Sequence, residues 1–344
     1  MGKGKTKFLI VRFSSIGDIV LTTPLIRCLK LQYPGAEIHY VVKKKFGMVL
    51  EHNPYIDHLH YLDNNLDELV GRFREERFDY IIDLHKTLRS YLLRIKLRRK
   101  TLSFRKLSVE KFLITRFGID LLPEGKHVVG RILDTVKPLG VEDDGKPVDY
   151  FLSEKERFDI GNLPPAYRQG YVAFVIGGQH FTKRLPFEKI STICAGLSLP
   201  VVLLGGPEDR EVGERLEREA GNPVFNLCGK LSFNTSVSVL EQSKLVIAHD
   251  TGLMHISGAF DKPVISVWGA TSPGKFGVWP YRSTVRYEAQ VPGLPCNPCS
   301  NFGSSKCPKG HFKCMWMQDE ALMIAEAGRM TERNGSNDFF TLNS

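Results

Sequence analysis

The chain has 344 residues, of which 42% are hydrophobic and 25% are charged, a composition typical of a globular protein. Its length favours two domains over one. No apolar run approaches the roughly 18 residues that a membrane-spanning helix needs. The basic N-terminus continues into an apolar run that Arg12 interrupts, and no small-residue cleavage site follows. We therefore interpret this segment as a first strand and not as a signal peptide.

The net charge of +9 is concentrated in residues 86–116, which hold eleven basic residues and one acid, Glu110. We call these residues the basic segment. Apolar residues are interleaved with the basic ones, so we expect the segment to fold. A folded basic surface suggests an anionic partner, which can be a lipid phosphate, an anionic membrane surface or nucleic acid. The alternative is a solvated helical surface without a specific partner.

Short apolar runs alternate with amphipathic patterns along the chain. The predicted strands cover residues 7–12, 37–42, 58–61 and 79–84 in the first half and 171–176, 200–205, 223–227, 244–249 and 263–268 in the second. The predicted helices cover 17–32, 45–52, 66–76, 187–198, 209–219, 233–243 and 252–260, and a last helix is expected at 317–331.

This alternation is typical of α/β proteins in which helices cover a parallel sheet. Because it occurs twice, we expect two Rossmann-like domains. Their boundary lies within 143–170, where DDGKP, NLPP and RQG cluster turn-forming residues. Open parallel sheets bind ligands beyond the carboxyl ends of their strands, where helix N-termini point their amides. The residues at those strand ends are therefore the candidates for function.

The first strand end is the stretch RFSSIGDIVLTTP, residues 12–24, which carries a single carboxylate, Asp18. Gly17 allows a tight turn after Ser14 and Ser15, and Asp18 falls in the first helical turn. Two interpretations remain open. Asp18 either favours the helix dipole as an N-terminal acid or acts as a general base that points into a binding cleft.

In the second half, a Gly-Gly pair follows the predicted strand 171–176, so that a ligand can come close to the backbone. Lys183 comes shortly afterwards, beside a second basic residue and before a helix start. That position makes it a better phosphate ligand than an isolated surface lysine. Another Gly-Gly pair precedes Glu208 and Asp209. An acid there either holds ribose hydroxyls or caps the next helix.

The strongest local signal is KLVIAHDTGLMHISGAF, residues 244–260. A buried strand runs into Asp250, Thr251 and Gly252, and a helix starts at once. The free amides at this helix start and its positive end form an anion site, and His255 lies one turn into the helix. Asp250 or Thr251 can also be the N-cap, and both roles are compatible because they use the same geometry.

Four stretches resemble glycosyltransferase family 9, the bacterial heptosyltransferases: RFSSIGDIVLTTP, TKRLP, HDTGLMHISGAFDKPVISVWGATSP and CNPCSNFGSSKCPKGHFKCM. They span nearly the whole chain in the expected order. The resemblance implies a GT-B type α/β fold, with two Rossmann-like parallel-sheet domains facing a cleft. We expect an acceptor-binding domain at 1–155 and a donor-binding domain at 168–315. A C-terminal helix and tail at 316–344 is expected to pack back on the N-terminal domain.

The resemblance further implies an inverting transfer of heptose from ADP-heptose to the lipopolysaccharide inner core, without a metal or cofactor. Asp18 matches the catalytic base, and Ser14, Ser15 and Gly17 surround it. Lys183 would stabilise the leaving ADP. The implied donor-binding residues are Thr182, Lys183, Glu208 or Asp209, Asp250, Thr251, Gly252 and His255.

The implied acceptor is a phosphorylated glycolipid, for which the basic segment is a natural partner. Within it, Arg98, Arg99 and Lys100 are the predicted acceptor contacts. The resemblance places the protein in the cytoplasm, peripheral to the inner membrane, and gives no role to nucleic acid.

Four of the seven cysteines lie in the pattern Cys296-x2-Cys299-x7-Cys307-x6-Cys314, near His311. The first pair has the spacing of zinc ligands and the second pair does not. The resemblance implies no metal for the transfer. The thiols therefore hold structural zinc, stay reduced or form a conditional disulfide, since a stable disulfide is unfavourable in the cytosol.

Other functions remain as alternatives. A family 9-like transferase can use another nucleotide sugar. An epimerase or hydrolase of the same fold would leave the basic segment without a role. A nucleic-acid-binding protein would use the basic segment and the cysteines, but it would leave Asp18 and the Asp250-Thr251-Gly252 stretch without purpose, and no nucleic-acid-binding motif is present.

Overall fold

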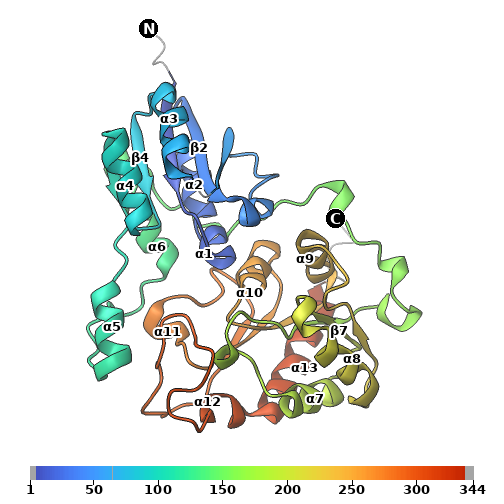
Figure 1. The fold of residues 1–344 in the computed structure, drawn as a ribbon. Helices are drawn as coiled ribbons and strands as arrows, with labels where there is room; N and C mark the ends of the chain where they lie inside the picture. The colour runs from blue at the N-terminus through green and yellow to red at the C-terminus, as the bar shows by residue number, and fades with distance from the viewer. Residues whose placement is uncertain (1–4, 64, 338–344) are drawn as a thin grey trace. The chain divides into compact units, whose positions relative to one another are not determined.

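The computed structural model describes residues 5–63 and 65–337, with side chains described up to residue 332. The chain forms two compact units (Figure 1). The first contains residues 1–107 and 126–153, and the second contains residues 108–125 and 154–344. Each unit is built on one parallel sheet, so the predicted pair of α/β parallel-sheet domains is confirmed.

The first unit has a five-stranded parallel sheet with the strand order β3-β2-β1-β4-β5. The strands are β1 (Thr6–Val11), β2 (Ala36–Lys43), β3 (His58–Leu62), β4 (Tyr80–Asp83) and β5 (Lys100–Ser103). The helices are α1 (Ile16–Val20), α2 (Thr23–Gln32), the 3-10 helix η1 (Lys44–Val49), α3 (Leu66–Glu76), α4 (Leu88–Leu97) and α6 (Val128–Leu133).

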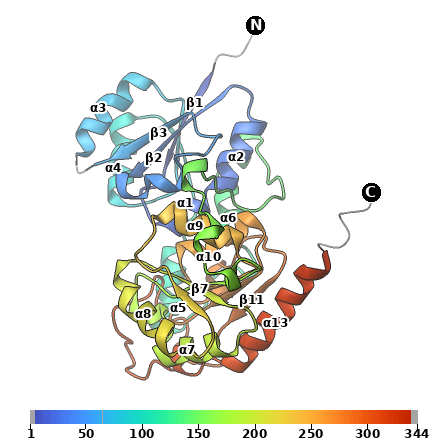
Figure 2. The same ribbon diagram turned by 90° about the vertical axis from the view of Figure 1, so that its right-hand side faces the viewer.

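Helices cover both faces of this sheet (Figure 2). On one face, Phe73 of α3 and Leu93 of α4 belong to the same buried cluster as Leu9 of β1. On the other face, α2 contacts both β2 and α6. Because helices cover both faces of the sheet, side chains on both faces of β1 are apolar, and its sequence is a continuous apolar run.

The predicted helix at 17–32 is divided into α1 and α2. Pro24 has no N–H to donate to the carbonyl oxygen of Val20, so the regular helical hydrogen bond is lost there. The hydroxyl of Thr23 donates to that carbonyl instead, at 2.8 Å. The break leaves α1 as a short helix of its own, with Asp18 in its first turn.

The second unit has a six-stranded sheet with the order β11-β10-β9-β6-β7-β8, again parallel. Its strands are β6 (Val172–Val175), β7 (Val201–Leu204), β8 (Val224–Asn226), β9 (Leu245–His249), β10 (Val264–Val267) and β11 (Arg286–Ala289). Its helices are α5 (Ser108–Phe117), α7 (Phe187–Gly196), α8 (Arg210–Glu219), α9 (Phe233–Gln242), α10 (Gly252–Ser257), α11 (Pro273–Phe276), α12 (Lys313–Trp316) and α13 (Glu320–Asn337).

The C-terminal helix α13 packs on the second unit, where it contacts α7 and β9 (Figure 2). Met323, Ala327 and Met330 lie at helical spacing and are buried in the core cluster of that unit. A Cβ on Gly196 of α7 would lie only 2.4 Å from Ile324, so the two helices approach closely at this glycine. We therefore assign α13 to the second unit, in contrast to our expectation that it packs back on the first.

The sequence patterns did not predict two of the strands, β5 and β11. Both are four-residue edge strands with mostly polar sequences, KTLS and RYEA, which carry little apolar signal. Among the described residues, no helix is both long and apolar enough to cross a membrane.

Candidate functional site

The strand order places a topological switch point in each sheet. In the first, the chain passes to opposite sides of β1, so the carboxyl ends of β1 and β4 flank the switch point. In the second sheet, the carboxyl ends of β6 and β9 flank the switch point. Ligands of open parallel sheets bind at such points. The residues that follow these four strands form two clusters, one on each unit.

The first-sheet cluster consists of Arg12, Asp18, His85 and Lys106. Asp18 lies in the first turn of α1 and its Oδ2 accepts hydrogen bonds from the backbone N–H of Ser15, at 3.2 Å, and from the Ser15 hydroxyl, at 2.8 Å. Asp18 is therefore the third helical residue of a capping box whose N-cap is Ser15, and as an acid in the first turn it also favours the helix dipole. Its side chain remains 39% exposed, so the cap does not remove it from solvent.

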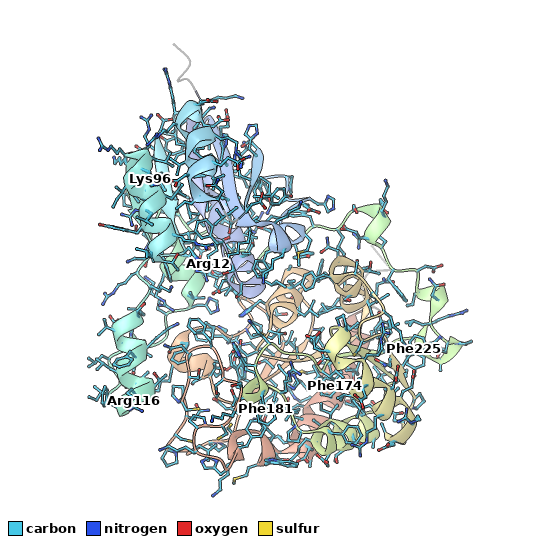
Figure 3. The ribbon with its side chains drawn as sticks, in the orientation of Figure 1. Arg12, Lys96, Arg116, Phe174, Phe181 and Phe225 are labelled. Atoms are coloured by element: carbon cyan, nitrogen blue, oxygen red, sulfur yellow. The ribbon has the colours of Figure 1, made fainter. Side chains whose placement is uncertain are left out.

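Arg12, labelled in Figure 3, is the main partner of Asp18. The distance between its Nη2 and Asp18 Oδ2 is 2.5 Å. The guanidinium also donates to two backbone carbonyls, from Nε to Ser14 at 2.7 Å and from Nη1 to Leu84 at 2.7 Å. Because these carbonyls follow β1 and β4, the planar guanidinium bridges the switch point. It holds the Asp18 carboxylate in one orientation.

These contacts control the protonation of Asp18. Burial raises its pKa, but the charge of Arg12 and the hydrogen bonds from Ser15 outweigh that effect and lower the pKa to about 2. Asp18 is therefore ionised at every physiological pH.

His85 and Lys106 complete the cluster, and the sequence analysis missed both. The Lys106 ammonium donates to the His85 carbonyl at 3.2 Å. Burial, together with the charges of Arg12 and Lys106, lowers the pKa of His85 to about 4, so its imidazole is neutral. Burial and the charge of Arg12 lower the pKa of Lys106. Asp18 was chosen because it follows the carboxyl end of a strand. The same criterion selects His85, because it lies just beyond β4.

Ser15 donates to the Asp18 carboxylate, and Ser14 and Gly17 lie in the same turn, but Arg98, Arg99 and Lys100 do not lie near it. Lys100 is the first residue of β5 and pairs with Tyr80, the first residue of β4. In a parallel sheet all amino ends share one edge. The exposed residues 98–100 therefore lie at the edge opposite to the carboxyl ends, where Asp18 is found.

The second-sheet cluster consists of Lys183, Asp250, Thr251 and Thr271. The Lys183 Nζ lies 2.6 Å from Asp250 Oδ2 and donates to the Asp250 carbonyl at 3.3 Å. The same Oδ2 accepts the Thr271 hydroxyl at 2.8 Å. These residues follow β6, β9 and β10, three adjacent strands. Both ionic side chains are at most 14% exposed, so this is a largely buried pair.

The start of α10 adds hydrogen-bonding groups to this cluster. Thr251 is its N-cap residue, yet its buried Oγ1 makes no hydrogen bond within the described part of the chain. Gly252 is the first helical residue, and His255 is buried one turn further on. A buried hydroxyl without a partner costs free energy. A ligand oxygen beside the free amides of this helix start would satisfy it.

The two candidate ribose acids differ in their surroundings. Asp209 is 4% exposed, accepts the Gly206 N–H at 2.9 Å and lies 3.4 Å from the Arg184 guanidinium. A Cβ on Gly177 would approach its Oδ2 to 2.4 Å, so that glycine is needed to make room for the carboxylate. Asp209 thus ties the turns after β6 and β7 together. Glu208 is exposed and its carboxylate is available to a ligand.

Thr182 holds the chain behind Lys183. Its hydroxyl accepts the Ser304 N–H at 2.8 Å, and its own N–H donates to the Ser304 carbonyl at 3.1 Å. Gly303 has a φ of +88°, and a Cβ there would lie 3.1 Å from the Lys183 side chain. The segment after residue 296 therefore buttresses Lys183, a role that no pattern in the sequence indicated.

The four clustered cysteines are free thiols. Cys296 Sγ lies 3.8 Å from His311 Nε2. Burial and the neighbouring thiols raise the pKa of Cys299, and raise that of Cys314 to about 12. Among the described residues, only Glu37, His39 and His58 bring three metal-binding atoms within 4.8 Å of one another.

His249 ends β9, and its imidazole is fully buried. Its Nε2 accepts the Leu185 N–H at 3.0 Å, and its Nδ1 lies 3.2 Å from the Gly177 carbonyl. Burial lowers its pKa to about 4. A neutral ring with the proton on Nδ1 satisfies both contacts, so His249 braces the turn that leads to Lys183.

Relatives of known function align with most of this chain. It is 25% identical over 308 residues to lipooligosaccharide heptosyltransferase 2 of Haemophilus influenzae, an alignment that covers 77% of this chain and 84% of the relative. It is 26% identical over 321 residues to lipopolysaccharide heptosyltransferase 1 of Pseudomonas aeruginosa, covering 84% of this chain and 86% of the relative.

A solved structure of the same fold is the family 9 glycosyltransferase of Veillonella parvula, with a TM-score of 0.77, 22% identity and coverage of 97% of this chain and 99% of that one. Its similarity supports a GT-B type fold. The model of the family described as Glycosyltransferase family 9 (heptosyltransferase) matches residues 67–305. Because this match covers more than half of the sequence, the chain belongs to glycosyltransferase family 9 and is a glycosyltransferase.

Proposed function

We propose that this enzyme transfers a heptose from ADP-heptose to the inner core of lipopolysaccharide, with inversion at the anomeric carbon. The observation that carries the proposal is that each sheet has a charged cluster at its switch point. One cluster offers a carboxylate that can accept a proton, and the other offers a cation and a helix start suited to phosphates. These are the two requirements of a single displacement from a nucleoside diphosphate sugar.

In the proposed reaction, the acceptor hydroxyl oxygen attacks the anomeric carbon of the donor. A new glycosidic bond forms as the bond between that carbon and the ADP oxygen breaks. Asp18 receives the proton of the hydroxyl, and the electron pair of the broken bond leaves with ADP. Arg12 positions Asp18, because it fixes the carboxylate through its contacts across the switch point.

The low pKa of Asp18 bears on when this proposed proton transfer occurs. A carboxylate with a pKa of about 2 is always available but is a weak base. It gains basicity if its Arg12 contact loosens, and it accepts a proton readily once the attacking oxygen has become acidic. We therefore infer that the proton moves late, after bond formation to the anomeric carbon has begun.

The donor diphosphate would bind at the second-sheet cluster. Lys183 is the cation there, and it is paired with Asp250. The Thr251 hydroxyl and the amides at the start of α10 would donate to phosphate oxygens. Glu208 is the better candidate for the ribose hydroxyls, because Asp209 is buried and already paired.

The acceptor is proposed to be a phosphorylated glycolipid at the first-sheet cluster. Lys106 and the exposed Lys86, which follow β5 and β4, supply positive charge at the same sheet edge as Asp18. These residues replace Arg98, Arg99 and Lys100 as our candidates for contacts with acceptor phosphates.

We further propose that the enzyme works at the cytoplasmic face of the inner membrane through the basic segment. On α4, Leu88, Tyr91, Leu92 and Ile95 form an exposed stripe at helical spacing. Basic residues flank it, including Arg89 and Lys96, the second of which is labelled in Figure 3. An apolar stripe flanked by positive charge is suited to an anionic lipid surface.

Vesicle sedimentation tests this membrane contact. Leu88→Ser with Ile95→Ser should weaken binding to vesicles that contain anionic phospholipid. Leu31→Ser, which changes an exposed leucine of α2, is the matched control and should bind like the wild type. Equal binding of all three proteins would refute the α4 contact.

Calorimetry with ADP, UDP, GDP and CMP tests the donor. We expect selective binding of ADP by the wild type, loss of binding in Lys183→Ala, and unchanged binding in Lys155→Ala, which removes an exposed lysine of the same unit. A preference for UDP or GDP would keep the glycosyltransferase but replace ADP-heptose by another nucleotide sugar. Unchanged ADP binding by Lys183→Ala would refute the diphosphate role of Lys183.

A further inference from the structure

A histidine cluster lies at the opposite end of the first sheet from Asp18. It consists of Glu37 and His39 on β2 and of His58 and His60 on β3. The register pairs His39 with His58, and side chains two residues apart along a strand point to the same face. Glu37, His39, His58 and His60 therefore gather on one face, near the amino ends of both strands.

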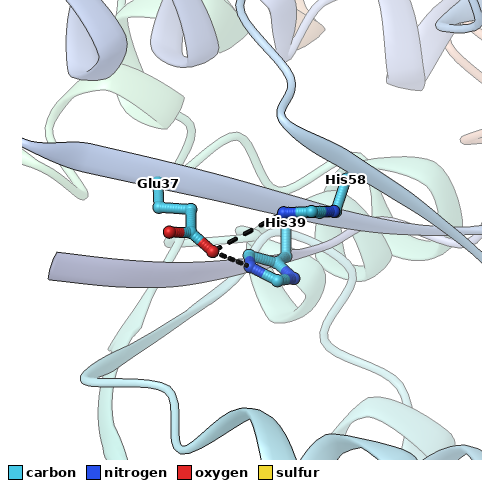
Figure 4. Close-up of side chains that lie close together, drawn as sticks. All are labelled: Glu37, His39 and His58. Carbon is cyan, nitrogen blue, oxygen red and sulfur yellow. Dashed lines mark hydrogen bonds and ion pairs between the residues drawn. The ribbon is translucent and has the colours of Figure 1, made fainter. Parts of the chain in front are cut away.

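We propose that Glu37, His39 and His58 form a binding site for a divalent late transition metal ion such as Zn²⁺. Figure 4 shows both imidazoles directed at the same carboxylate oxygen. The Oε1 of Glu37 lies 3.1 Å from His39 Nε2 and 3.5 Å from His58 Nε2. All three ligand atoms lie within 4.8 Å of one another.

These distances are close to those of a metal site. Zinc bonds of about 2.0–2.2 Å in tetrahedral geometry place neighbouring ligand atoms about 3.3–3.6 Å apart. The His58 separation of 3.5 Å lies within that range, and the His39 separation of 3.1 Å lies just below it. Two histidines and one carboxylate are a common zinc donor set. His58 is 53% exposed, so water can reach the metal and fill the fourth position.

His60 orients the inner ligand. Its Nε2 lies 2.9 Å from His39 Nδ1, the ring nitrogen that faces away from Glu37. Metal-bound histidines commonly donate their second N–H to a hydrogen-bond acceptor, which fixes the tautomer and the ring orientation. His60 Nε2 lies where that acceptor is needed. His60 is itself held by an edge contact with Phe73 of α3, at 4.9 Å between ring centroids.

A purely structural role accounts for only part of the cluster. A hydrogen bond to Glu37 satisfies the buried His39 without a metal. It does not require the exposed His58 to lie against His39, with 4.3 Å between ring centroids and 33° between ring planes, or to direct its Nε2 at the same oxygen. Lys5 and Lys7 balance the Glu37 charge, and Lys7 has a second partner in Glu76 at 2.7 Å.

The metal would act on the fold and not on the transfer. Glu37 is the second residue of β2 and His58 the first of β3, so the site lies at the sheet edge away from the first-sheet cluster. β3 is an edge strand, and a metal bridge would fasten it to β2. The inference is therefore independent of the proposed transfer reaction.

Competition of Zn²⁺ between the reduced full-length protein and a chromophoric chelator tests the site. Because the cysteines are alternative ligands, all variants are made in a Cys296→Ser, Cys299→Ser background. We expect one Zn²⁺ per chain in this background. His58→Ala should weaken binding at least tenfold, and His60→Phe, which keeps the ring contact with Phe73, should weaken it roughly 10–100-fold.

His52→Ala, an exposed histidine of the same unit, is the control and should bind Zn²⁺ like the background protein. The Co²⁺ form should show ligand-field bands without sulfur charge transfer. Absence of Zn²⁺ binding in the Cys296→Ser, Cys299→Ser background would overturn the proposal, and so would unchanged affinity in His58→Ala.

Discussion

Replacement of Arg12 by glutamine tests what holds the Asp18 carboxylate in its ionised state. Arg12→Gln removes the positive charge 2.5 Å from Asp18 Oδ2 and keeps a side chain of similar length. Burial would then act against only the hydrogen bonds from Ser15. We expect the pKa of Asp18 to rise from about 2 to its ordinary value of 3.8 or above.

The expected change in the free energy of unfolding follows from this difference in the pKa of Asp18. One pKa step corresponds to 1.36 kcal/mol, which would give about 2.4 kcal/mol for the whole change. Because the Asp18 side chain is 39% exposed, solvent screening reduces the contribution to roughly 1 kcal/mol of the free energy of unfolding. The lost hydrogen bonds to the Ser14 and Leu84 carbonyls add about 1 kcal/mol each, independently of pH.

The pH dependence has a definite sign. The folded-state pKa of Asp18 lies below that of the unfolded chain, so ionisation of Asp18 stabilises the wild type above about pH 4. This stabilisation is lost as the pH falls toward about 2. The gap in unfolding free energy between the wild type and Arg12→Gln should therefore narrow over that interval.

Carboxyl ¹³C NMR of Asp18 measures the pKa directly. Between about pH 3 and 6, the wild-type signal should hardly move, whereas the Arg12→Gln signal should titrate. Arg12→Lys, which keeps the charge, is the control and should resemble the wild type. If Asp18 in Arg12→Gln stays ionised throughout this range, Arg12 is not the cause of the low pKa and our account of the first-sheet cluster is incorrect.

Three substitutions test the packing of the second unit. Gly177→Ala places a Cβ 2.4 Å from Asp209 Oδ2 and should lower the free energy of unfolding by about 1–3 kcal/mol. In Gly178→Ala the new Cβ meets its nearest neighbour at 3.4 Å, so the loss should be smaller. Urea unfolding measures both, and equal losses of unfolding free energy would contradict this reasoning. Tyr171→Phe removes a buried hydroxyl that donates to the Val239 carbonyl at 2.6 Å. It should lower the unfolding free energy by about 1–3 kcal/mol, and an unchanged urea midpoint would contradict this.

Local patterns predicted much of the fold. The predicted helix 66–76 has the same bounds as α3, because Asn65 caps its start and its apolar residues face the core. β1 was predicted within one residue from its apolar run. The division of 17–32 was missed, although Pro24 marks it, because the apolar periodicity continues through the break. β5 was missed because an edge strand in a basic stretch has little apolar signal.

The candidate site was less accessible to sequence reasoning, because its contacts depend on strand order. Lys183 and Asp250 are far apart in the chain and meet only because β6 lies beside β9. The choice between Glu208 and Asp209 stayed open until burial separated them. The histidine cluster likewise depends on the register of β2 and β3, which alternation of residue types does not reveal.

The transfer reaction itself tests the central claim most directly. The assay follows heptose transfer from ADP-heptose to a heptose-free lipopolysaccharide acceptor, detected by mass spectrometry. Asp18→Asn keeps the size of the side chain and removes its charge. Asp63→Asn, at an exposed acid of the same unit, is the matched control. Calorimetry of ADP binding verifies that each variant retains its donor site.

We predict that Asp18→Asn lowers the transfer rate by about 10²–10⁴-fold while ADP binding stays unchanged, the loss expected when a general base is removed. Asp63→Asn should transfer heptose at the wild-type rate. Transfer by Asp18→Asn at the wild-type rate would show that Asp18 only caps α1 and that another group accepts the proton.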